Sequence, residues 1–517
     1  MKKRRQSPAS SRTQDSDQLG LFAYEIDEDP LETPITNHAG LPAVLETFRV
    51  LGGREAVERS IRLKQRKRGF GEADLVEAFI ALLAAGGECP EDFETLRADV
   101  GLTQLLGGPL PSRSPARQFL YGFHDAALMD ERPAREEQAA WVPAESAPLS
   151  GLDRVNRTLV RETAAQGEDG CACATLDMDA SIIESHKREA YKHYEGGRGY
   201  QPEIVVWSER DLIVADEFRD GNVPAGRDPL SVVQRGFAAL PEQVSTYAFR
   251  GDSACYEHDL LNWLRDPARP GGPEGVITFA VSADMSVELR DAITALPDEA
   301  WEELAARDKG AASDEVRHVA EVPFVPQARG ITKRTPPDRY IAIRVRPRQG
   351  ELFADGASEK RFAIVTNDFE RPCSELVHWH REKAGTVEHV HDVLKNELGA
   401  GTMPCGRFGA NAAWFRLNVL TYNVLSAFKR LTLPDKLHTA RPKKLRFHLL
   451  GAAARVVRHA GRTLLRVAGR AEAVKQLYAA RQALKTIWRK VRARRRALLR
   501  RRRRSAGRSP EAILASA

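Results

Sequence analysis

A half-apolar stripe runs along residues 385–398 at the spacing of a helix. The positions of the stripe, which recur at i, i+4, i+7 and i+11, are Val387, His391, Leu394 and Leu398. Because residues at these intervals share one face, the pattern predicts an amphipathic helix. Glu388, Asp392 and Lys395 keep a similar spacing one position later and form a charged stripe beside the apolar one. Alone, such a stripe is typical of a solvated face with a Glu–Lys pair.

Residues 174–183 alternate between apolar and polar side chains, as a strand with an acidic face does. The polar side of this strand carries Asp177, Asp179 and Ser181. Residues 203–218 then predict a β-hairpin. The elements that follow are a helix over 230–240, a strand over 244–249, a helix over 256–264 and a strand over 276–281. The order β, β, β, α, β, α, β predicts an α/β fold, with Asp179 on its first strand and Asp252 just after its fourth.

The segments on either side carry other patterns. Apolar residues at helical spacing from residue 41 to about residue 130 predict a small helical domain, without a specific helix-turn-helix pattern. Residues 131–165 are rich in Pro, Glu and Ala and are interpreted as a linker. Strand-like runs precede the amphipathic helix at 316–324, 340–345 and 362–366. A long apolar helix over 410–431 follows it and is expected to pack in the core.

The composition indicates which class of protein this is. With 42% hydrophobic and 29% charged residues among 517, the chain is typical of a soluble protein of several domains. No apolar run is long enough to cross a membrane, and the basic N-terminus lacks the apolar stretch of a signal peptide. The six cysteines are scattered, and the one close pair, Cys171 and Cys173, has no second pair to complete a zinc site. We therefore expect reduced thiols and a cytoplasmic protein.

The net charge of +7 conceals an asymmetry. Residues 441–508 hold 24 Lys or Arg and one acid, Glu472, whereas the rest of the chain holds 54 basic and 70 acidic side chains. Apolar residues at helical spacing between 474 and 491 predict that much of this basic arm is helical. Such an arm suits a polyanion, most often nucleic acid, and the alternative is a solvated tail. The candidate DNA contacts in the arm are Arg489, Lys490, Arg494, Arg495 and Arg496.

The three acidic positions acquire a chemical meaning when they are combined. Carboxylates from two neighbouring strands and from a later helix, here Asp179, Asp252 and Glu388, can converge at one sheet edge. Oxygen ligands of this kind suit Mg²⁺ or Mn²⁺, and two such ions about 4 Å apart can clamp the two oxygens of a phosphodiester displacement. Asp179 is favoured over Asp177 because it lies in the later half of the strand, before Ser181. Asp177 is then a partner that orients a lysine or a metal-bound water.

Five stretches of the chain together resemble bacterial insertion-sequence transposases of the DDE type, most closely the insertion-sequence-1380 family. The stretches are Thr-Leu-Asp-Met-Asp-Ala-Ser181, Arg219-Asp-Gly-Asn222, Phe-Arg-Gly-Asp-Ser253, Lys383-Ala-Gly-Thr-Val-Glu388 through Lys395, and Phe408-Gly-Ala-Asn-Ala-Ala-Trp414. The resemblance spans nearly the whole chain. It implies that Asp179, Asp252 and Glu388 carry the metals and that Lys395 contacts a phosphate near the scissile bond.

The resemblance also marks further DNA contacts. Related transposases carry a Tyr and an Arg upstream of the glutamate, whereas the corresponding text here, His-Trp-His-Arg381, lacks the Tyr. Trp379 and Arg381 are therefore candidate DNA contacts, together with Arg250 of the second acidic stretch. Histidines 378, 380, 389 and 391 could suggest a metal cluster, but positions 389 and 391 point to different faces of a helix. Surface or DNA-contacting histidines are favoured over a zinc site.

The resemblance implies an α/β, ribonuclease-H-like core with a mixed sheet, a β-rich insertion before the catalytic helix, an N-terminal helical domain and a basic helical C-terminal arm. The expected segments are a disordered N-terminus (1–40), a helical DNA-binding-like domain and linker (41–165), the first part of the catalytic core (166–284), the β-rich insertion (285–370), the catalytic helix and end of the core (371–435), and the basic helical arm (436–517).

The expected function is that of a transposase, which binds the terminal inverted repeats of its element, cuts at the ends and joins them to target DNA. We expect Mg²⁺ as the cofactor, with Mn²⁺ able to substitute, and no small-molecule cofactor. The expected partners are double-stranded DNA, as element ends and target, and a second copy of the chain, since two ends must be paired. No membrane is involved, and the protein is expected at the nucleoid. The alternatives are a ribonuclease-H-like nuclease that cuts without joining, and a catalytically inactive DNA-binding protein descended from a transposase.

Overall fold

The computed structural model describes residues 33–506, apart from gaps at 65–67, 135–136, 138, 168–170, 306–314, 327–336, 348–352 and 354–356. Most of the predicted disordered N-terminus therefore lies outside the described residues. Its last part forms a short strand, β1 (Ile35–Thr36), which pairs with a strand near the C-terminus. Among the helices of the described ranges, none combines the length and apolarity needed to cross a membrane.

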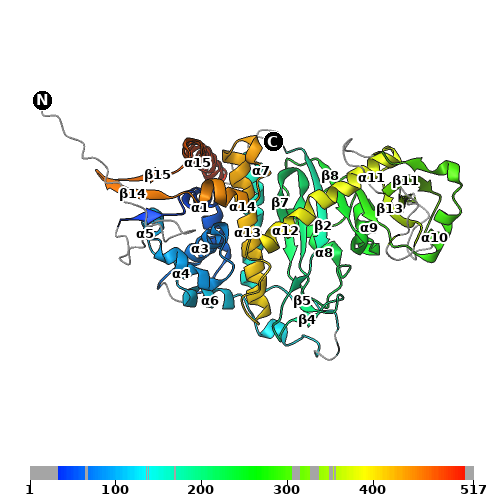
Figure 1. Ribbon diagram of the computed structural model, residues 1–517, viewed down its shortest axis with the longest axis horizontal. Coiled ribbons are helices and arrows are strands. Elements are labelled where there is room, and N and C mark those ends of the chain that lie inside the picture. Colours follow the sequence, from blue (N-terminus) through cyan, green and yellow to red (C-terminus); the bar gives the residue numbers. More distant parts are fainter. Residues whose placement is uncertain are drawn as a thin grey trace, which may run out of the picture.

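A nine-stranded mixed sheet forms the centre of the molecule (Figure 1). Its first five strands in the chain are β2 (Cys173–Ala180), β6 (Glu203–Trp207), β7 (Leu212–Glu217), β8 (Thr246–Gly251) and β9 (Ile277–Ser282). Strands β2, β6 and β7 form an antiparallel meander, and β8 and β9 add to the other side of β2 in parallel. With α8 (Pro229–Ala239) and α9 (His258–Arg265), these strands have the predicted order β, β, β, α, β, α, β. The prediction of a mixed-sheet α/β fold is confirmed, and the arrangement is consistent with a ribonuclease-H-like core.

The insertion continues the same sheet. After α10 (Val287–Thr294), the strands β10 (Glu302–Glu303), β11 (Glu315–Val322), β12 (Arg339–Pro347) and β13 (Lys360–Thr366) follow. β13 pairs antiparallel with β9, so this segment extends the central sheet. Helix α11 (Cys373–Arg381) packs Leu376 and Val377 on this extension. The chain then passes through a 3₁₀ turn (Glu382–Gly385) into α12 (Val387–Asn396), which crosses back to the central strands (Figure 1).

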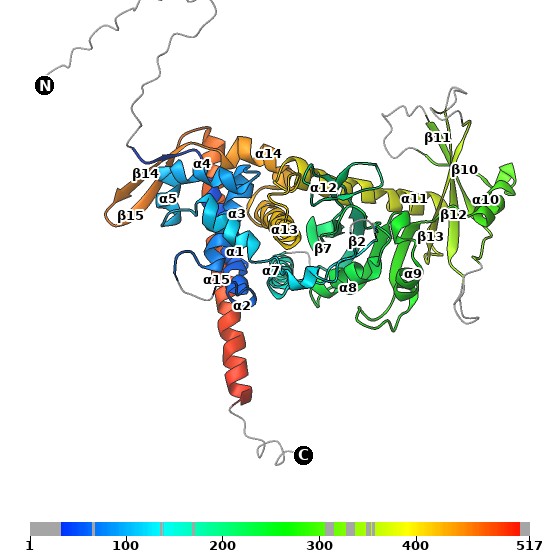
Figure 2. The ribbon, with the colours of Figure 1, turned by 90° about the horizontal axis from the view of Figure 1, so that it is seen from below.

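A helical part lies on the opposite side of the central strands, as Figure 2 shows. Its helices are α1 (Leu41–Val50), α2 (Gly53–Ser60), α3 (Glu72–Ala85), α4 (Phe93–Ala98), α5 (Val100–Leu106) and α6 (Arg113–Tyr121). The long helix α13 (Phe408–Thr432) is buried along almost its whole length, because these helices cover one side and the sheet the other. The prediction of a long core helix is confirmed.

Two segments differ from the prediction. The expected linker contains α7 (Ala147–Ala164), whose apolar residues, Leu149, Leu152, Val155 and Leu159 among them, are buried in the core. Pro, Glu and Ala are therefore compatible with a buried helix here, since the apolar residues recur at helical spacing. In the C-terminal region, α14 (Pro442–Leu445) and a π-helical turn (Arg446–Leu450) precede a β-hairpin, β14 (Ala454–His459) and β15 (Arg462–Val467), where helix was predicted. The helix α15 (Ala471–Ala506) begins only after this hairpin.

Candidate catalytic site

Asp179 and Asp252 meet at one edge of the sheet. Their strands β2 and β8 are parallel neighbours, and Asp177 lies opposite Arg250, so each aspartate comes two residues beyond this pair. The two carboxyl groups lie within hydrogen-bond reach of each other. Burial raises the pKa of Asp252, and the negative charge of Asp179 adds to this effect. The sheet edge therefore concentrates negative charge in a partly dehydrated place.

Local packing fixes the position of Asp252. A Cβ on the preceding residue, Gly251, would lie 2.5 Å from the Cβ of Cys255, so the tight turn requires glycine there. The carboxylate of Asp252 accepts a hydrogen bond from the backbone N–H of Ala254 at 3.1 Å. The Arg-Gly-Asp-Ser sequence is thus a strand end followed by a turn that presents the aspartate.

A lysine that sequence analysis left without a role lies between the two aspartates. Lys383 is 7% exposed, and its Nζ lies 3.3 Å from Oδ1 of Asp179. Burial opposes its charge, but the carboxylates of Asp179 and Asp252 raise the pKa of Lys383 above its ordinary value. Its position in the stretch that ends at Glu388 was a signal, because that stretch contributes to the resemblance.

Glu388 occupies the first turn of α12 and is exposed. The helix is amphipathic as predicted, with Val387, His391 and Leu394 buried. Within the described ranges, no group of three or more His, Cys, Asp or Glu side chains gathers closely enough to hold a metal ion. The structure therefore brings Asp179 and Asp252 together and leaves Glu388 outside this pair.

Lys395 anchors α12 to the residues that follow strand β2. Its Nζ donates to Oγ of Ser181 at 3.2 Å and to the backbone carbonyl of Ile182 at 2.9 Å. The lysine remains partly exposed, and its ammonium lies beside Ser181, two residues after Asp179.

Asp177 differs sharply from Asp179, although the two share a strand face. Asp177 is 0% exposed, and its carboxylate accepts hydrogen bonds from Nε and Nη2 of Arg250 at 2.6 and 2.9 Å. The hydroxyls of Ser208 and Thr386 also donate to it. These four bonds leave the carboxylate fully engaged with protein groups.

The same contacts place Arg250 in the interior, against the prediction that it contacts DNA. Arg250 is 2% exposed, and its guanidinium also donates to the backbone carbonyl of Trp379 at 2.6 Å and to Glu382 at 3.0 Å. The prediction failed because the pattern of the strand end does not distinguish an arginine that pairs with an acid on the next strand from one that faces outward.

Two histidines brace the backbone of the aspartates. His391 donates from Nε2 to the backbone carbonyl of Asp179 at 3.2 Å, and His380 donates to that of Gly251 at 3.0 Å. Burial lowers the pKa of each histidine to about 4, so both are neutral at pH 7. His391 is 5% exposed. The expectation of surface or DNA-contacting histidines is wrong for His391, which is a buried hydrogen-bond donor.

A cavity of about 520 Å³ extends from Asp252 along the insertion. Arg317 and Arg381 line it together with apolar residues of β12 and β13, and Arg381 is exposed. Trp379 is partly exposed, and its ring contacts the guanidinium groups of Arg250 and Arg371 at 5.4 and 4.5 Å from the ring centroid. Arg381 is therefore available to a ligand beside the aspartates.

A second cavity, of about 810 Å³, opens on the other side of Asp252. The turn between the short strands β4 (Tyr191–Lys192) and β5 (Arg198–Tyr200) forms its far wall. Tyr194 on this turn is 78% exposed. An exposed aromatic ring thus faces the same approach to the aspartates.

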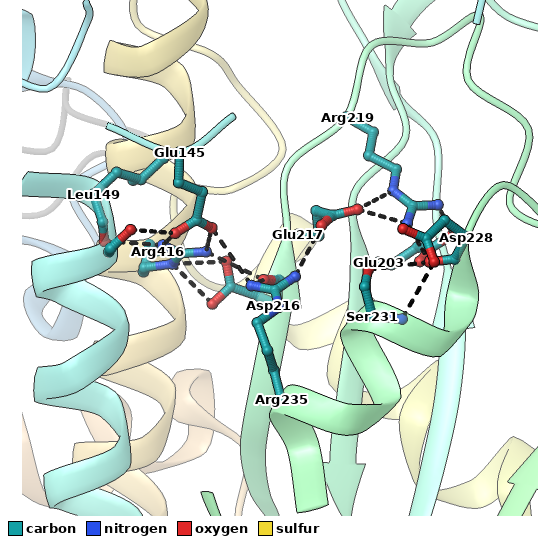
Figure 3. Close-up of polar contacts among 11 residues, drawn as sticks. Glu145, Leu149, Glu203, Asp216, Glu217, Arg219, Asp228, Ser231, Arg235 and Arg416 are labelled. Atoms are coloured by element: carbon teal, nitrogen blue, oxygen red, sulfur yellow. Dashed lines mark hydrogen bonds and ion pairs between the residues drawn. The ribbon is translucent and has the colours of Figure 1, made fainter. Parts of the chain in front are cut away.

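Arg219, the first residue of the Arg219–Asn222 stretch, belongs to a buried ionic network, shown in Figure 3. Arg219 is 0% exposed and pairs with Glu203 and with Glu217. Glu217 also accepts from Arg235 at 2.9 Å. Farther along the network, Arg416 of α13 pairs with Asp216 at 2.9 Å and Glu145 at 2.7 Å. This network joins the sheet to α13 and the segment before α7.

The candidate DNA contacts of the arm lie on α15. Arg489, Lys490 and Arg496 are exposed, whereas Arg494 forms an ion pair with Glu162 at 2.7 Å. The side chain of Arg495 lies outside the described part of the helix. Ile487 and Val491 of the same helix pack against Val50 of α1, on the side that also carries Arg494. The basic face of α15 is therefore oriented by an apolar contact.

Comparison with known proteins identifies one family. The chain matches the transposase DDE domain, group 1, over residues 33–488. A solved structure, the synaptic complex of piggyBac transposase with hairpin DNA, aligns with a TM-score of 0.41 at 11% sequence identity, covering 88% of this chain and 81% of that one. No curated protein matches the chain.

Proposed function

The chain belongs to the transposase DDE domain group 1 family, and from this premise we propose that it cuts DNA at the ends of its own insertion sequence and joins those ends to target DNA. Membership of the family makes it a transposase-type enzyme that acts on DNA. The observation that carries the more specific proposal is the meeting of Asp179 and Asp252 at the ends of two parallel strands. The five stretches described above support assignment to the insertion-sequence-1380 group.

We propose that Asp179, Asp252 and Glu388 hold divalent metal ions, with Mg²⁺ as the natural ion and Mn²⁺ able to replace it. The two aspartates fit this role because they lie within hydrogen-bond reach and share Lys383, so the pair retains an excess of negative charge. Glu388, exposed on the adjoining helix, would complete the set from the side of the incoming DNA. Bound ions would supply activation of the attacking oxygen and neutralisation of the leaving one.

The surrounding residues would orient the DNA and the carboxylates. His391 and His380 hold the backbone at Asp179 and Gly251, which would keep the two carboxylates in position when metal ions bind. Lys395 would contact a phosphate near the scissile bond, since its ammonium lies at the surface beside Ser181. Arg381 and Trp379 would contact the DNA strand that leaves along the insertion.

The rest of the DNA would lie along the basic arm. Arg489, Lys490, Arg494, Arg495 and Arg496 are proposed to contact phosphates, and each contact adds about 0.9 to the salt dependence of binding. Two copies of the chain would be needed to pair two element ends, which makes a homodimer the smallest working assembly. The protein would act at the nucleoid.

One reaction tests this proposal against its alternatives. The full-length protein is incubated with Mg²⁺, a duplex that carries the end of its own element, and a supercoiled target plasmid, and the 3′ ends of the products are mapped. Nicks at the element boundary together with joined products are expected. Cutting without joining would indicate a nuclease, and binding without metal-dependent cutting would indicate an inactive DNA-binding descendant.

A further inference from the structure

The hairpin β14–β15 has an unusually exposed position and a tight turn. Its strands pair antiparallel from Ala454↔Val467 to His459↔Arg462. Ala460 and Gly461 both have positive φ, 46° and 71°, which are the signs of a type I′ turn that joins two strands directly. Figures 1 and 2 show the hairpin projecting from the helical end of the molecule, far from the insertion.

The two faces of the hairpin differ in character. On one face, Ala454 and Val456 are 2% and 3% exposed, so this face rests on the protein. Since cross-strand partners share a face, the outer face carries three pairs in succession. These pairs are Arg455↔Arg466, Val457↔Leu464 and His459↔Arg462. Leu464 is 43% exposed, and the arginines are exposed.

The charges on this face lack acidic partners in the described part of the chain. No ion pair joins Arg455, Arg462 or Arg466 to a described Asp or Glu, and the sequence from 441 to 471 contains no acid. Like charges directly opposite each other destabilise a strand pair. The Arg455↔Arg466 pair therefore lowers the stability of the hairpin unless an anion binds it.

We propose that the outer face of β14–β15 binds the major groove of duplex DNA, at the end of the element that the transposase recognises. This inference rests on the proposed function for the identity of the duplex, and on the hairpin itself for the contact. A two-stranded ribbon fits the major groove, and six residues span about 20 Å, or about six base-pair steps. The arginine pairs would meet phosphates or guanine edges, and Val457 and Leu464 between them suit thymine methyl groups.

The neighbouring elements favour DNA over other polyanions. The basic helix α15 begins four residues after Val467, so ribbon and arm form one continuous basic surface on a chain whose family acts on DNA. Strand β1 pairs with β14 at its base and holds the ribbon in a fixed orientation. A rigid, pre-oriented ribbon can read a groove without the cost of ordering a loop.

The test compares the variant Arg455→Gln/Arg466→Gln with the control Arg113→Gln/Arg290→Gln, which removes the same charge from exposed sites elsewhere. Binding of each full-length protein to a 40-bp duplex with the element end, and to a scrambled duplex, is measured by fluorescence anisotropy from 50 to 300 mM NaCl. For the ribbon variant, affinity for the element end is expected to fall at least about tenfold, and the log–log salt slope by up to about 1.8. The control should retain the wild-type values within threefold.

Protection of guanine from dimethyl sulfate and the melting temperature provide two further tests of the ribbon variant. In wild-type complexes, guanine N7 atoms within about six base pairs should be protected from dimethyl sulfate, and the ribbon variant should lose this protection. Its melting temperature should be equal to or above that of wild type, because a repulsive pair has been removed. Unchanged affinity, slope and protection in the ribbon variant would overturn the proposal.

The experiment also separates this proposal from the function on which it rests. If the wild-type protein prefers neither duplex and cuts neither, the proposed recognition of element ends fails. A fall in the salt slope on the scrambled duplex would still support the ribbon as a DNA contact, and an unchanged slope there would reject it.

Discussion

Two groups of buried or half-buried carboxylates lie on the same sheet and differ in their partners. In the network of Figure 3, four carboxylates contact a guanidinium: Glu145 and Asp216 contact Arg416, and Glu203 and Glu217 contact Arg219. At the same end of the strands, on β2 and just after β8, Asp179 and Asp252 approach each other and share the ammonium of Lys383. In the first group these four carboxylates are paired with arginines of the chain itself, and the second group carries negative charge that a ligand can use.

A structural ion pair and a reactive one can be told apart by the partners of each carboxylate. Burial alone does not separate them, because burial raises the pKa of Asp216 to about 6 as well as that of Asp252. The partners decide: although burial opposes its ionisation, Arg416 lowers the pKa of Glu145 to about 2, so this group is held as an ion pair. Carboxylates that face each other across one lysine are poised for a further cation.

The largest effect on DNA cutting is expected from neutralising one of the two facing aspartates. Asp179→Asn and Asp252→Asn should each lower DNA cutting at least about 10³-fold, equal to about 4 kcal/mol of transition-state stabilisation. The free energy of unfolding should change little, because the relieved repulsion between the two aspartates offsets the lost attraction to Lys383. Cutting by gel assay and unfolding by urea give the two values. A variant that cuts at the wild-type rate would remove that aspartate from the catalytic set.

Removing an arginine from the network of Figure 3 should instead lower stability and leave the rate of cutting nearly unchanged. Arg416→Met leaves Asp216, which is 1% exposed, without its cation, and should reduce the free energy of unfolding by about 3–5 kcal/mol. The rate of cutting per folded molecule should remain within about threefold, since Arg416 does not touch the aspartate pair. Urea unfolding at pH 7 checks the first value. A loss below about 1 kcal/mol would mean that this network does little for stability.

Asp177 lies two residues from Asp179 but is paired with an arginine, like the carboxylates of Figure 3. Asp177→Asn leaves Arg250 with one charged partner fewer and should cost about 1–3 kcal/mol of stability. Any loss of cutting should be equal in Mg²⁺ and Mn²⁺, because the carboxylate is already engaged by protein groups. A defect rescued only by Mn²⁺ would assign Asp177 to the metal site.

The smallest effect concerns pH. The folded pKa of His391 is about 4 and its unfolded value is 6.5, so the unfolded chain takes up more protons between these limits. Stability should therefore fall as pH drops from 7 to 5, by about 2 kcal/mol from this group. His391→Gln keeps a donor for the carbonyl of Asp179 and should lose that part of the pH dependence. Urea unfolding of both proteins at the two pH values would show no difference in slope if His391 were charged in the folded state.

Sequence patterns foretold the elements better than the roles of individual charges. The amphipathic helix, the acidic strand and the hairpin that follows it were predictable because their apolar periodicities are long and regular. Lys383 and Arg250 were not, since the side-chain pattern of one element does not reveal which acid lies opposite on another. Asp177 and Asp179 have the same face and almost the same context, and only the pairing of β2 with β8 separates them.

The C-terminal hairpin shows a signal that was available and overlooked. Two six-residue runs flank Ala460-Gly461, each with apolar residues between arginines. The basic composition of the whole arm masks this pattern, because each apolar pair is short and is flanked by arginines. Conversely, α7 was missed because Pro and Ala near its start resemble a linker.

The central position of α13 has a consequence for how a newly made chain can fold. Phe79 of α3 packs its ring against Trp414 of α13 at 6.0 Å between ring centroids. About 320 residues separate the end of α3 from the start of α13, so at 5–20 residues per second the ribosome needs roughly 20–60 s to supply the partner. During that interval the apolar faces of the N-terminal helices lack their partner. A nascent chain of this transposase therefore stays exposed to proteases and chaperones until synthesis is four-fifths complete, and fragments that stop earlier do not acquire its core.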